Sequence, residues 1–206
     1  ISGKHRYTTS VNFRTIDYDI NDLGFSTNTN FISYYGYYGY RLLQPQGAFN
    51  NIFLNFNLNL NRRLEPDLYN RFNFNFNSSF TTKEFIAFGG GFETTPFGTN
   101  DIYEPRTEGR FVKQPAYYNP WVWISTDYRK RFAFELDLEL VSFDEKNRNI
   151  KSFGVSPRYR FSDKWKVNAG ARVNYSSNEQ GYVNRIDDDI LFGQRDRNTI
   201  ITSLES

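Results

Sequence analysis

Apolar and polar residues alternate one by one along much of this 206-residue chain. The pattern is clearest in IFLNFNLNLN at residues 52–61, RFNFNFN at residues 71–77 and FAFELDLEL at residues 132–140. A fourth stretch, residues 165–175, alternates in the same way. Because successive side chains of a β-strand point to opposite faces, each stretch predicts a strand with one apolar and one wet face.

The length of these stretches separates two kinds of β-protein. Strands of soluble proteins are typically about 5–6 residues long, whereas a strand that crosses a membrane needs about 9–11 residues. Several stretches reach the greater length without the closely spaced turns of a β-sandwich. We therefore predict an all-β, antiparallel transmembrane β-barrel that occupies residues 1–206 as a single domain with no internal boundary. Its strands are expected at Lys4–Arg14, Phe31–Leu42, Phe49–Asn61, Tyr69–Ser79, Lys83–Glu93, Ala116–Asp127, Arg131–Phe143, Asn149–Phe161, Lys164–Ser176 and Ile190–Ser203.

The connections between these strands are expected to alternate in length. The short ones are Leu43–Ala48, Phe80–Thr82, Tyr128–Lys130 and Ser162–Asp163. The longer or more polar ones are Thr15–Asn30, Arg62–Leu68, Thr94–Pro115, Asp144–Arg148 and Ser177–Asp189. Outer-membrane barrels have short periplasmic turns and longer external loops, so this alternation favours the same architecture.

The last residues bear on the size of the barrel. Outer-membrane barrels normally finish on a strand with an aromatic last residue, whereas Thr202–Ser206 stop in mid-alternation. A sheet edge cannot remain unpaired in lipid. We therefore expect an incomplete segment, of about ten strands, from a larger barrel. Lys4–Arg14 is then not expected to pair with Ile190–Ser203.

Composition excludes several other classes of protein. There is no run of about 20 apolar residues that could form a transmembrane helix. An aromatic content of 19% argues against disorder. The net charge of +2 gives no electrostatic basis for binding nucleic acid or anionic lipid. The absence of cysteine excludes disulfides and thiolate zinc sites.

The two faces of the strands are expected to meet different environments, because an unpaired amide in hydrocarbon is costly. The residues predicted to line the lumen are Asn55, Asn57, Asn59, Asn73, Asn75, Glu135, Asp137, Glu139, Arg158 and Arg172. The residues predicted to face lipid are Leu54, Phe56, Leu58, Phe72, Phe74, Phe134, Leu136 and Leu138.

The face pattern also predicts the register of the hairpin that contains the FAFELDLEL stretch. A slip by one residue would turn its acidic side chains toward lipid. The length of the turn places Glu139 opposite Ser152 and Glu135 opposite Ser156. Arg158 is then diagonal to Glu135, within reach of its carboxylate.

Aromatic residues gather on two of the expected strands. Amphipathic rings favour the boundary between lipid headgroups and water, so we interpret these residues as an aromatic belt. The alternative is a stacked aromatic face inside a soluble barrel. The residues are Tyr34, Tyr35, Tyr37, Tyr38, Tyr40, Tyr117, Tyr118, Trp121 and Trp123.

No combination of residues predicts catalysis. His5 is the single histidine, so it cannot join others in a catalytic triad or a histidine metal cluster. Glu135, Asp137 and Glu139 have a spacing compatible with glycosidase carboxylates. Three acids on one strand are more simply explained as the lining of a wet lumen.

Two further motifs have weak functional interpretations. Asp187, Asp188 and Asp189 could bind Ca²⁺, although their spacing does not match an EF-hand and a hydrated loop paired with nearby arginines is favoured. The run Gly89–Gly91 lacks the lysine and the helix of a phosphate loop, and instead indicates a bend or a close approach of backbones. No cofactor is expected.

Several segments together resemble a large family of Gram-negative outer-membrane proteins. Members join an N-terminal domain like carbohydrate-binding module family 9 to a long C-terminal domain of unknown function, read as a β-barrel. The resemblance spans nearly the whole chain and concerns the barrel part. It implies an outer-membrane location and glycan handling, and it carries over no functional residues. The matching segments are Asn21–Phe25, Ile32–Gly36, Gly39–Arg41, Glu104–Arg110, Ser125–Lys130, Ser156–Phe161, Gly181–Asn184 and Asp187–Gly193.

These observations lead to one functional hypothesis and one alternative. The first is an outer-membrane barrel with a structural, transport or complex-forming role and no catalysis in this segment. Its expected partners are membrane lipid, other outer-membrane proteins, and glycans bound through a domain outside this chain; nucleic acid is not expected. The alternative is a soluble all-β carbohydrate-binding module that uses aromatic stacking.

Overall fold

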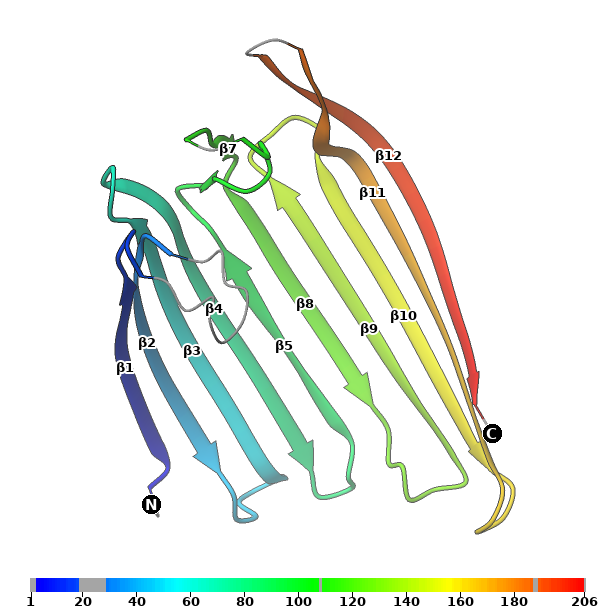
Figure 1. The fold of residues 1–206 in the computed structure, drawn as a ribbon. Coiled ribbons are helices and arrows are strands. Elements are labelled where there is room, and N and C mark those ends of the chain that lie inside the picture. Colours follow the sequence, from blue (N-terminus) through cyan, green and yellow to red (C-terminus); the bar gives the residue numbers. More distant parts are fainter. Residues whose placement is uncertain (1–2, 19–28, 108, 187–188, 206) are drawn as a thin grey trace.

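The computed structural model describes residues 3–18, 29–107, 109–186 and 189–205, which form one broad sheet (Figure 1). Among these residues no helix is long and apolar enough to cross a membrane. The strands are β1 (His5–Arg14), β2 (Phe31–Leu42), β3 (Phe49–Arg63), β4 (Leu68–Thr82), β5 (Ala87–Thr94), β6 (Thr99–Asp101), β7 (Val112–Gln114), β8 (Tyr117–Ser125), β9 (Phe132–Phe143), β10 (Asn149–Arg160), β11 (Lys166–Ile186) and β12 (Asp189–Glu205).

The sheet is antiparallel and follows chain order, β1-β2-β3-β4-β5-β8-β9-β10-β11-β12. The short strands β6 and β7 lie off this path: β6 continues the pairing of β4 beyond β5, and β7 pairs with β6. In the part of the chain that is described, β1 and β12 form the two edges and do not pair with each other, so the sheet is open. The prediction of an all-β antiparallel sheet is thus confirmed, and so is the absence of pairing between the first and last strands.

Two expected connections are wrong. The turn predicted at Phe80–Thr82 lies at residues 83–86, because β4 continues to Thr82 and β5 begins at Ala87. Phe80 stacks on Phe88 of β5 with ring centroids 5.3 Å apart, which holds this end of β4 in the sheet. The loop predicted at Ser177–Asp189 is strand as far as Ile186.

The connections do not alternate strictly in length as predicted. Irregularities in the pairing of β11 with β12, at Ser176/Glu179 and Tyr182/Asn184, absorb extra residues and let the hairpin continue. The connections at residues 64–67 and 144–148 are no longer than the one at residues 43–48. The sequence also gave no indication of β6 and β7, which lie within the expected loop Thr94–Pro115.

The register sorts the side chains into two faces as expected. Asn55, Asn57 and Asn59 of β3 lie opposite Asn77, Asn75 and Asn73 of β4. In the β9–β10 hairpin, Glu139 is opposite Ser152 and Glu135 is opposite Ser156, which confirms the predicted register. Arg158 is opposite Ala133 and therefore diagonal to Glu135. We call the side with the asparagines and acids the polar face, and the other side the apolar face.

Exposure on the two faces is the reverse of that in a soluble sheet protein. Along β8, the apolar-face residues Tyr118, Val122 and Ile124 are 47%, 57% and 39% exposed. Trp121 and Trp123, on the polar face, are less exposed. Only Leu42 and Ala133 are buried hydrophobic residues in the described part of the chain.

The sheet is therefore a single layer without a core. Its accessible surface is 13990 Å², compared with about 10,000 Å² expected for a compact monomer of this mass. On the apolar face, rings contact each other sideways between strands: the Phe56 and Phe76 centroids are 4.7 Å apart, and those of Tyr38 and Phe56 are 5.8 Å apart. Such lateral contacts join neighbouring strands but leave the face uncovered.

Two neighbouring turns are joined by the side chain of Arg129, which forms an ion pair within its own turn and contacts an aromatic ring in the other. In the turn at residues 126–131, the Arg129 guanidinium donates two hydrogen bonds of 2.9 Å to the carboxylate of Asp127. The Arg129 backbone N–H donates a third, at 3.0 Å. The same guanidinium lies 3.3 Å from the ring centroid of Phe85, in the turn at residues 83–86. Hydrogen bonds from the Arg129 side chain and then from its backbone lower the pKa of Asp127 to about 2.

We expect Arg129→Ala to raise the pKa of Asp127 toward the ordinary value of about 3.9. The folded-state pKa lies below the unfolded-state value, so ionised Asp127 adds stability above pH 4 or so, which is lost as the pH falls toward about 2. Titration of the carboxyl carbon by NMR measures this pKa. Lys130→Ala is the control and should leave it nearly unchanged; equal shifts in both variants would contradict the role of Arg129.

Candidate functional site

The polar face carries a continuous network of side-chain hydrogen bonds over β2, β3 and β4. The Tyr35 hydroxyl donates to Oδ1 of Asn57 at 2.8 Å, and Nδ2 of Asn57 donates to Oδ1 of Asn75 at 3.2 Å. The next row is formed in the same way, with Tyr37 donating to Asn55 at 2.7 Å and Asn55 to Asn77 at 2.9 Å. The alternating asparagines therefore satisfy one another across strands.

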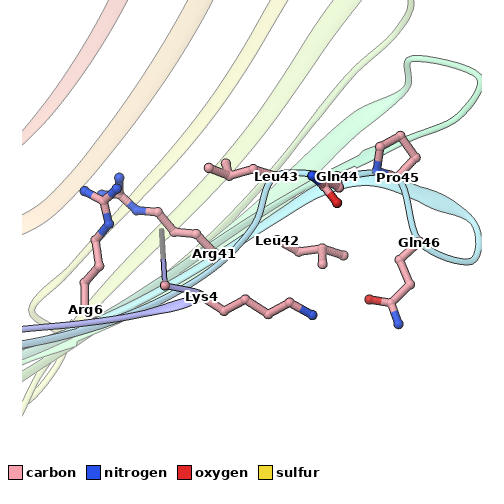
Figure 2. Close-up of a pocket in the computed structure, with 9 residues that line it drawn as sticks. Lys4, Arg6, Arg41, Leu42, Leu43, Gln44, Pro45 and Gln46 are labelled. Carbon is pink, nitrogen blue, oxygen red and sulfur yellow. The ribbon is translucent and has the colours of Figure 1, made fainter. Parts of the chain in front are cut away.

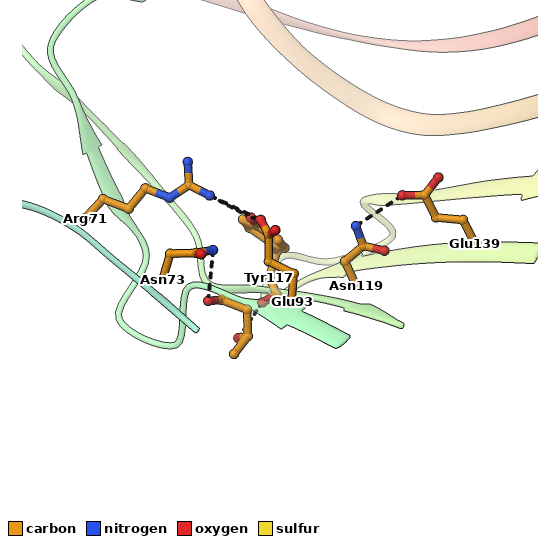
Figure 3. Close-up of polar contacts among 7 residues, drawn as sticks. Arg71, Asn73, Glu93, Tyr117, Asn119 and Glu139 are labelled. Atoms are coloured by element: carbon orange, nitrogen blue, oxygen red, sulfur yellow. Dashed lines mark hydrogen bonds and ion pairs between the residues drawn. The ribbon is translucent and has the colours of Figure 1, made fainter. Parts of the chain in front are cut away.

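A second cluster lies on β4, β5 and β8 (Figure 3). Nη2 of Arg71 is 3.3 Å from Oε1 of Glu93 and donates to the Tyr117 hydroxyl at 2.8 Å. The Tyr117 hydroxyl in turn donates to Glu93. Beside this cluster, Nδ2 of Asn119 donates to Oε1 of Glu139 at 3.1 Å. The Arg71 cluster was not predicted, although the alternation of side chains along the three strands places these residues on one face.

Glycines on the polar face leave space that is filled by larger side chains from the next strand. A Cβ atom at Gly91 would overlap the ring of Trp121, and one at Gly89 would come within 3.0 Å of Nε1 of Trp123. The two tryptophans thus lean from β8 over the backbone of β5. The close approach of backbones predicted for Gly89–Gly91 is confirmed, because a Cβ atom would also overlap the Ser78 carbonyl oxygen at Gly89 and that of Phe76 at Gly91.

Gly154 likewise leaves space, in this case for an ion pair between the two neighbouring strands. It lies opposite Asp137 on one side and opposite Arg172 on the other. Because Gly154 has no side chain, the guanidinium of Arg172 reaches across β10 to the carboxylate of Asp137, with an N–O distance of 2.6 Å. Arg172 therefore balances this acid, whereas the sequence suggested arginines of β10 for that role.

The remaining predicted residues have separate partners. Glu135 accepts a hydrogen bond of 3.5 Å from the Tyr128 hydroxyl. The guanidinium of Arg158 lies 5.3 Å from the centroid of the Tyr128 ring. His5, on the apolar face, stacks on Tyr38 and its Nδ1 is 3.0 Å from the Tyr38 hydroxyl.

The weak metal candidate is only partly described. Asp187 and Asp188 lie outside the described residues, and Asp189 begins β12 opposite Ile186. Within the described ranges no group of three or more His, Cys, Asp or Glu residues could hold a metal ion.

The predicted aromatic belt is divided between the two faces, because neighbouring residues of a strand point to opposite sides. This division corrects the interpretation of all these rings as one belt. On the apolar face lie Tyr34, Tyr38, Tyr40 and Tyr118. On the polar face lie Tyr35, Tyr37, Tyr117, Trp121 and Trp123.

A pocket of about 450 Å³ lies around the two tryptophans. Glu93, Asn119, Asp137 and Arg172 contribute polar groups to it, together with Asn75 and Glu139. Five strands, β4, β5, β8, β9 and β11, supply these polar-face residues. The pocket thus combines aromatic surface with charged and amide groups.

A second pocket, of about 530 Å³, lies near the turn at residues 43–48. Arg6 of β1 and Arg41 of β2 point the same way in Figure 2, whereas the Lys4 side chain points away from them. All three residues line the pocket. No acidic residue is among the described residues that line it. This end of the polar face is therefore basic.

The loop of residues 102–107 and 109–111, between β6 and β7, lies at the end of the sheet away from the chain's first residues (Figure 1). Oε1 of Glu104 accepts the backbone N–H of Tyr182 in β11 at 2.8 Å, and the guanidinium of Arg106 lies 4.8 Å from the Tyr182 ring centroid. Tyr103, beside them, lines a pocket of about 510 Å³ together with Asn12 of β1 and other residues. The loop therefore lies close to both β1 and β11, near opposite ends of the strand order.

Arg148 reinforces this end of the face. Its side chain is 10% exposed, and its Nη1 donates to Gln114 at 3.1 Å, to Glu145 at 3.1 Å and to Gln180 at 3.4 Å. The guanidinium also lies 4.2 Å from the ring centroid of Phe143. One arginine thus connects the loop region with β10 and β11.

We expect Gly91→Ala to lower the free energy of unfolding by about 1–3 kcal/mol. The added Cβ would overlap the Trp121 ring and the carbonyl oxygen of Phe76. Gly36→Ala is the control, since its Cβ would meet only Leu58 Cβ at 3.9 Å. Denaturant unfolding followed by tryptophan fluorescence makes the comparison; equal effects of both substitutions would show that the ring does not occupy this space.

We expect Glu104→Ala to speed hydrogen exchange of the Tyr182 amide, because that amide loses its acceptor 78 positions away in the sequence. Glu84→Ala, in the exposed turn at residues 83–86, should leave the rate unchanged. An unchanged Tyr182 rate in Glu104→Ala, measured by NMR or mass spectrometry, would mean that the loop is not held by this contact.

One family model matches the chain, over residues 1–206, and its description is a domain of unknown function (DUF5916). Comparisons with curated proteins and with solved structures give no significant match.

Proposed function

Because the match covers its whole length, the chain belongs to the DUF5916 family, and we propose that its sheet is part of the wall of a transmembrane β-barrel in the outer membrane of a Gram-negative bacterium. The apolar face contacts lipid, and the polar face lines an aqueous interior. The barrel has a structural, transport or complex-forming role, with no catalysis in this segment.

The observation that carries this proposal is the reversed exposure of the two faces. Leu58, Leu138 and Leu140 are 46%, 51% and 51% exposed on the apolar face, while Ser125 and Ser152 on the polar face are both 8% exposed. In water, exposed apolar area of this extent is unfavourable by roughly 25 cal/mol per Å². Lipid removes that cost, because hydrocarbon is as apolar as the side chains.

Strand length and edge chemistry support the same proposal. Strands β3 and β4 each have 15 residues, and β9 and β10 each have 12. These lengths exceed the minimum of about 9–11 residues for a membrane strand. The outer edges of β1 and β12 would need partner strands in lipid, where an unpaired backbone group is costly.

The partners follow from the two surfaces. Lipid covers the apolar face, and other outer-membrane proteins can associate with the barrel. Glycans would be bound through an N-terminal domain outside this chain, in line with the resemblance to proteins that carry a domain like carbohydrate-binding module family 9. A soluble carbohydrate-binding module is the second candidate, favoured by the position of Trp121 and Trp123 among polar groups.

Cell fractionation tests the proposal directly. We expect the full-length protein to sediment with the outer membrane and to require detergent for release. Recovery in the soluble periplasmic fraction without detergent would overturn the membrane proposal and favour the soluble binding module.

Adjacent substitutions in β9 test which face meets lipid. We expect Leu136→Glu to block membrane assembly far more severely than Glu135→Leu, because a charge on the lipid face near the midplane costs about 2–4 kcal/mol. The amount of folded protein in the outer-membrane fraction is the measurement. Similar levels of the two variants would remove the case for a lipid-facing side of this strand.

A further inference from the structure

The tryptophan pocket has the form of a ligand site. Trp121 and Trp123 lie against the backbone of β5 at Gly91 and Gly89, so one side of each ring is supported by the sheet. Both rings also line the pocket of about 450 Å³. Pockets for small ligands have volumes of about 300–1,000 Å³ and combine aromatic surface with a few polar groups.

One polar atom in this pocket is unsatisfied. Asn119 donates through Nδ2 to Glu139, whereas its Oδ1 is buried and has no hydrogen-bond donor within the described part of the chain. A buried acceptor without a donor costs about 1–3 kcal/mol. The oxygen has almost no accessible surface in the unliganded structure, so a ligand hydroxyl donates to it once the Asn119 amide turns toward the pocket.

The charges in the pocket are largely compensated before any ligand binds. Glu93 pairs with Arg71 at 3.3 Å, and Asp137 pairs with Arg172 at 2.6 Å. The third carboxylate, Glu139, accepts a hydrogen bond from Nδ2 of Asn119 and has no ion pair within the described residues. A strongly charged ligand would therefore have to break an existing ion pair. A neutral ligand with both donors and acceptors can instead bond to the outer lone pairs and N–H groups of these side chains.

We propose that this pocket binds a neutral saccharide. A pyranose ring has an apolar C–H face that stacks on the indole rings of Trp121 and Trp123. Its hydroxyl groups bond to the surrounding side chains, one of them donating to Oδ1 of Asn119. Same-face neighbours on a strand are roughly 6–7 Å apart, so the two rings offer a continuous stacking surface. The inference rests on the proposed function, since the pocket then lies in the aqueous interior of the barrel.

The experiment uses the full-length protein in detergent, with maltohexaose and cellohexaose as neutral probes and spermidine as a cationic one. Intrinsic tryptophan fluorescence reports binding, and the part of the change that is lost in the Trp121→Ala variant is assigned to this pocket, because glycan binding by any other domain of the full-length protein is the same in parent and variant. We expect a saturable change with at least one oligosaccharide. Trp121→Ala and Asn119→Leu should each weaken binding by about tenfold or more, as removal of a central contact commonly does.

Trp165→Ala is the matched control. Trp165 lies in the connection between β10 and β11 and is 67% exposed, so its removal should leave the affinity unchanged. Trp121→Phe retains a stacking ring and should bind within about threefold of the parent, which separates loss of the site from loss of folding. Equal weakening in the Trp165 and Trp121 variants, no saturable binding of either oligosaccharide, or binding of spermidine alone would overturn the proposal.

The fractionation result distinguishes this inference from the proposed function. A protein that sediments with the outer membrane but binds neither oligosaccharide contradicts the saccharide site alone. A protein that is soluble without detergent and still binds through Trp121 contradicts the barrel interior and leaves the saccharide site in place.

Discussion

The structure depends on backbone hydrogen bonding between neighbouring strands of one layer. Within the described residues no second sheet or helix covers either face, and only two hydrophobic residues are buried. The backbone groups are satisfied sideways, strand by strand, in chain order. Everything else follows from this arrangement: side chains are sorted by parity into two faces, and each face must find its own environment. The apolar face cannot find one within the described chain.

On the polar face, side chains satisfy their hydrogen-bonding groups through contacts between neighbouring strands. Asparagine suits the middle of a ladder because its amide both donates and accepts, so a row such as Tyr37–Asn55–Asn77 can extend over three strands. Glycine extends the reach further. Gly154 lets Asp137 and Arg172 form an ion pair across an intervening strand, and Gly91 accommodates the ring of Trp121. Glycines in these strands are therefore part of the side-chain arrangement rather than interruptions of it.

Sequence reasoning succeeded where a single local rule decides the outcome. Alternation alone predicted the two faces and, together with the length of the turn, the register of Glu139 against Ser152. It failed where contacts between distant segments decide. The polar Thr81 and Thr82 suggested a turn, yet ring stacking of Phe80 keeps them in β4. The loop at residues 102–111 has no periodicity of its own, and its position depends on the contact between Glu104 and Tyr182, which no local pattern encodes.

The polar face also differs along its width in how complete its hydrogen bonding is. Over β2–β4 the amides and hydroxyls bond mainly to one another, so a ligand would have to compete with existing bonds. Around β8 the glycines clear space above the backbone, two indole rings line that space, and the oxygen of Asn119 has no donor. A ligand gains little by covering side chains that already bond to one another, because their contact with water would be lost. An aromatic surface beside an unsatisfied acceptor offers a ligand new contacts. The features on which the proposed saccharide site rests are therefore concentrated around β8.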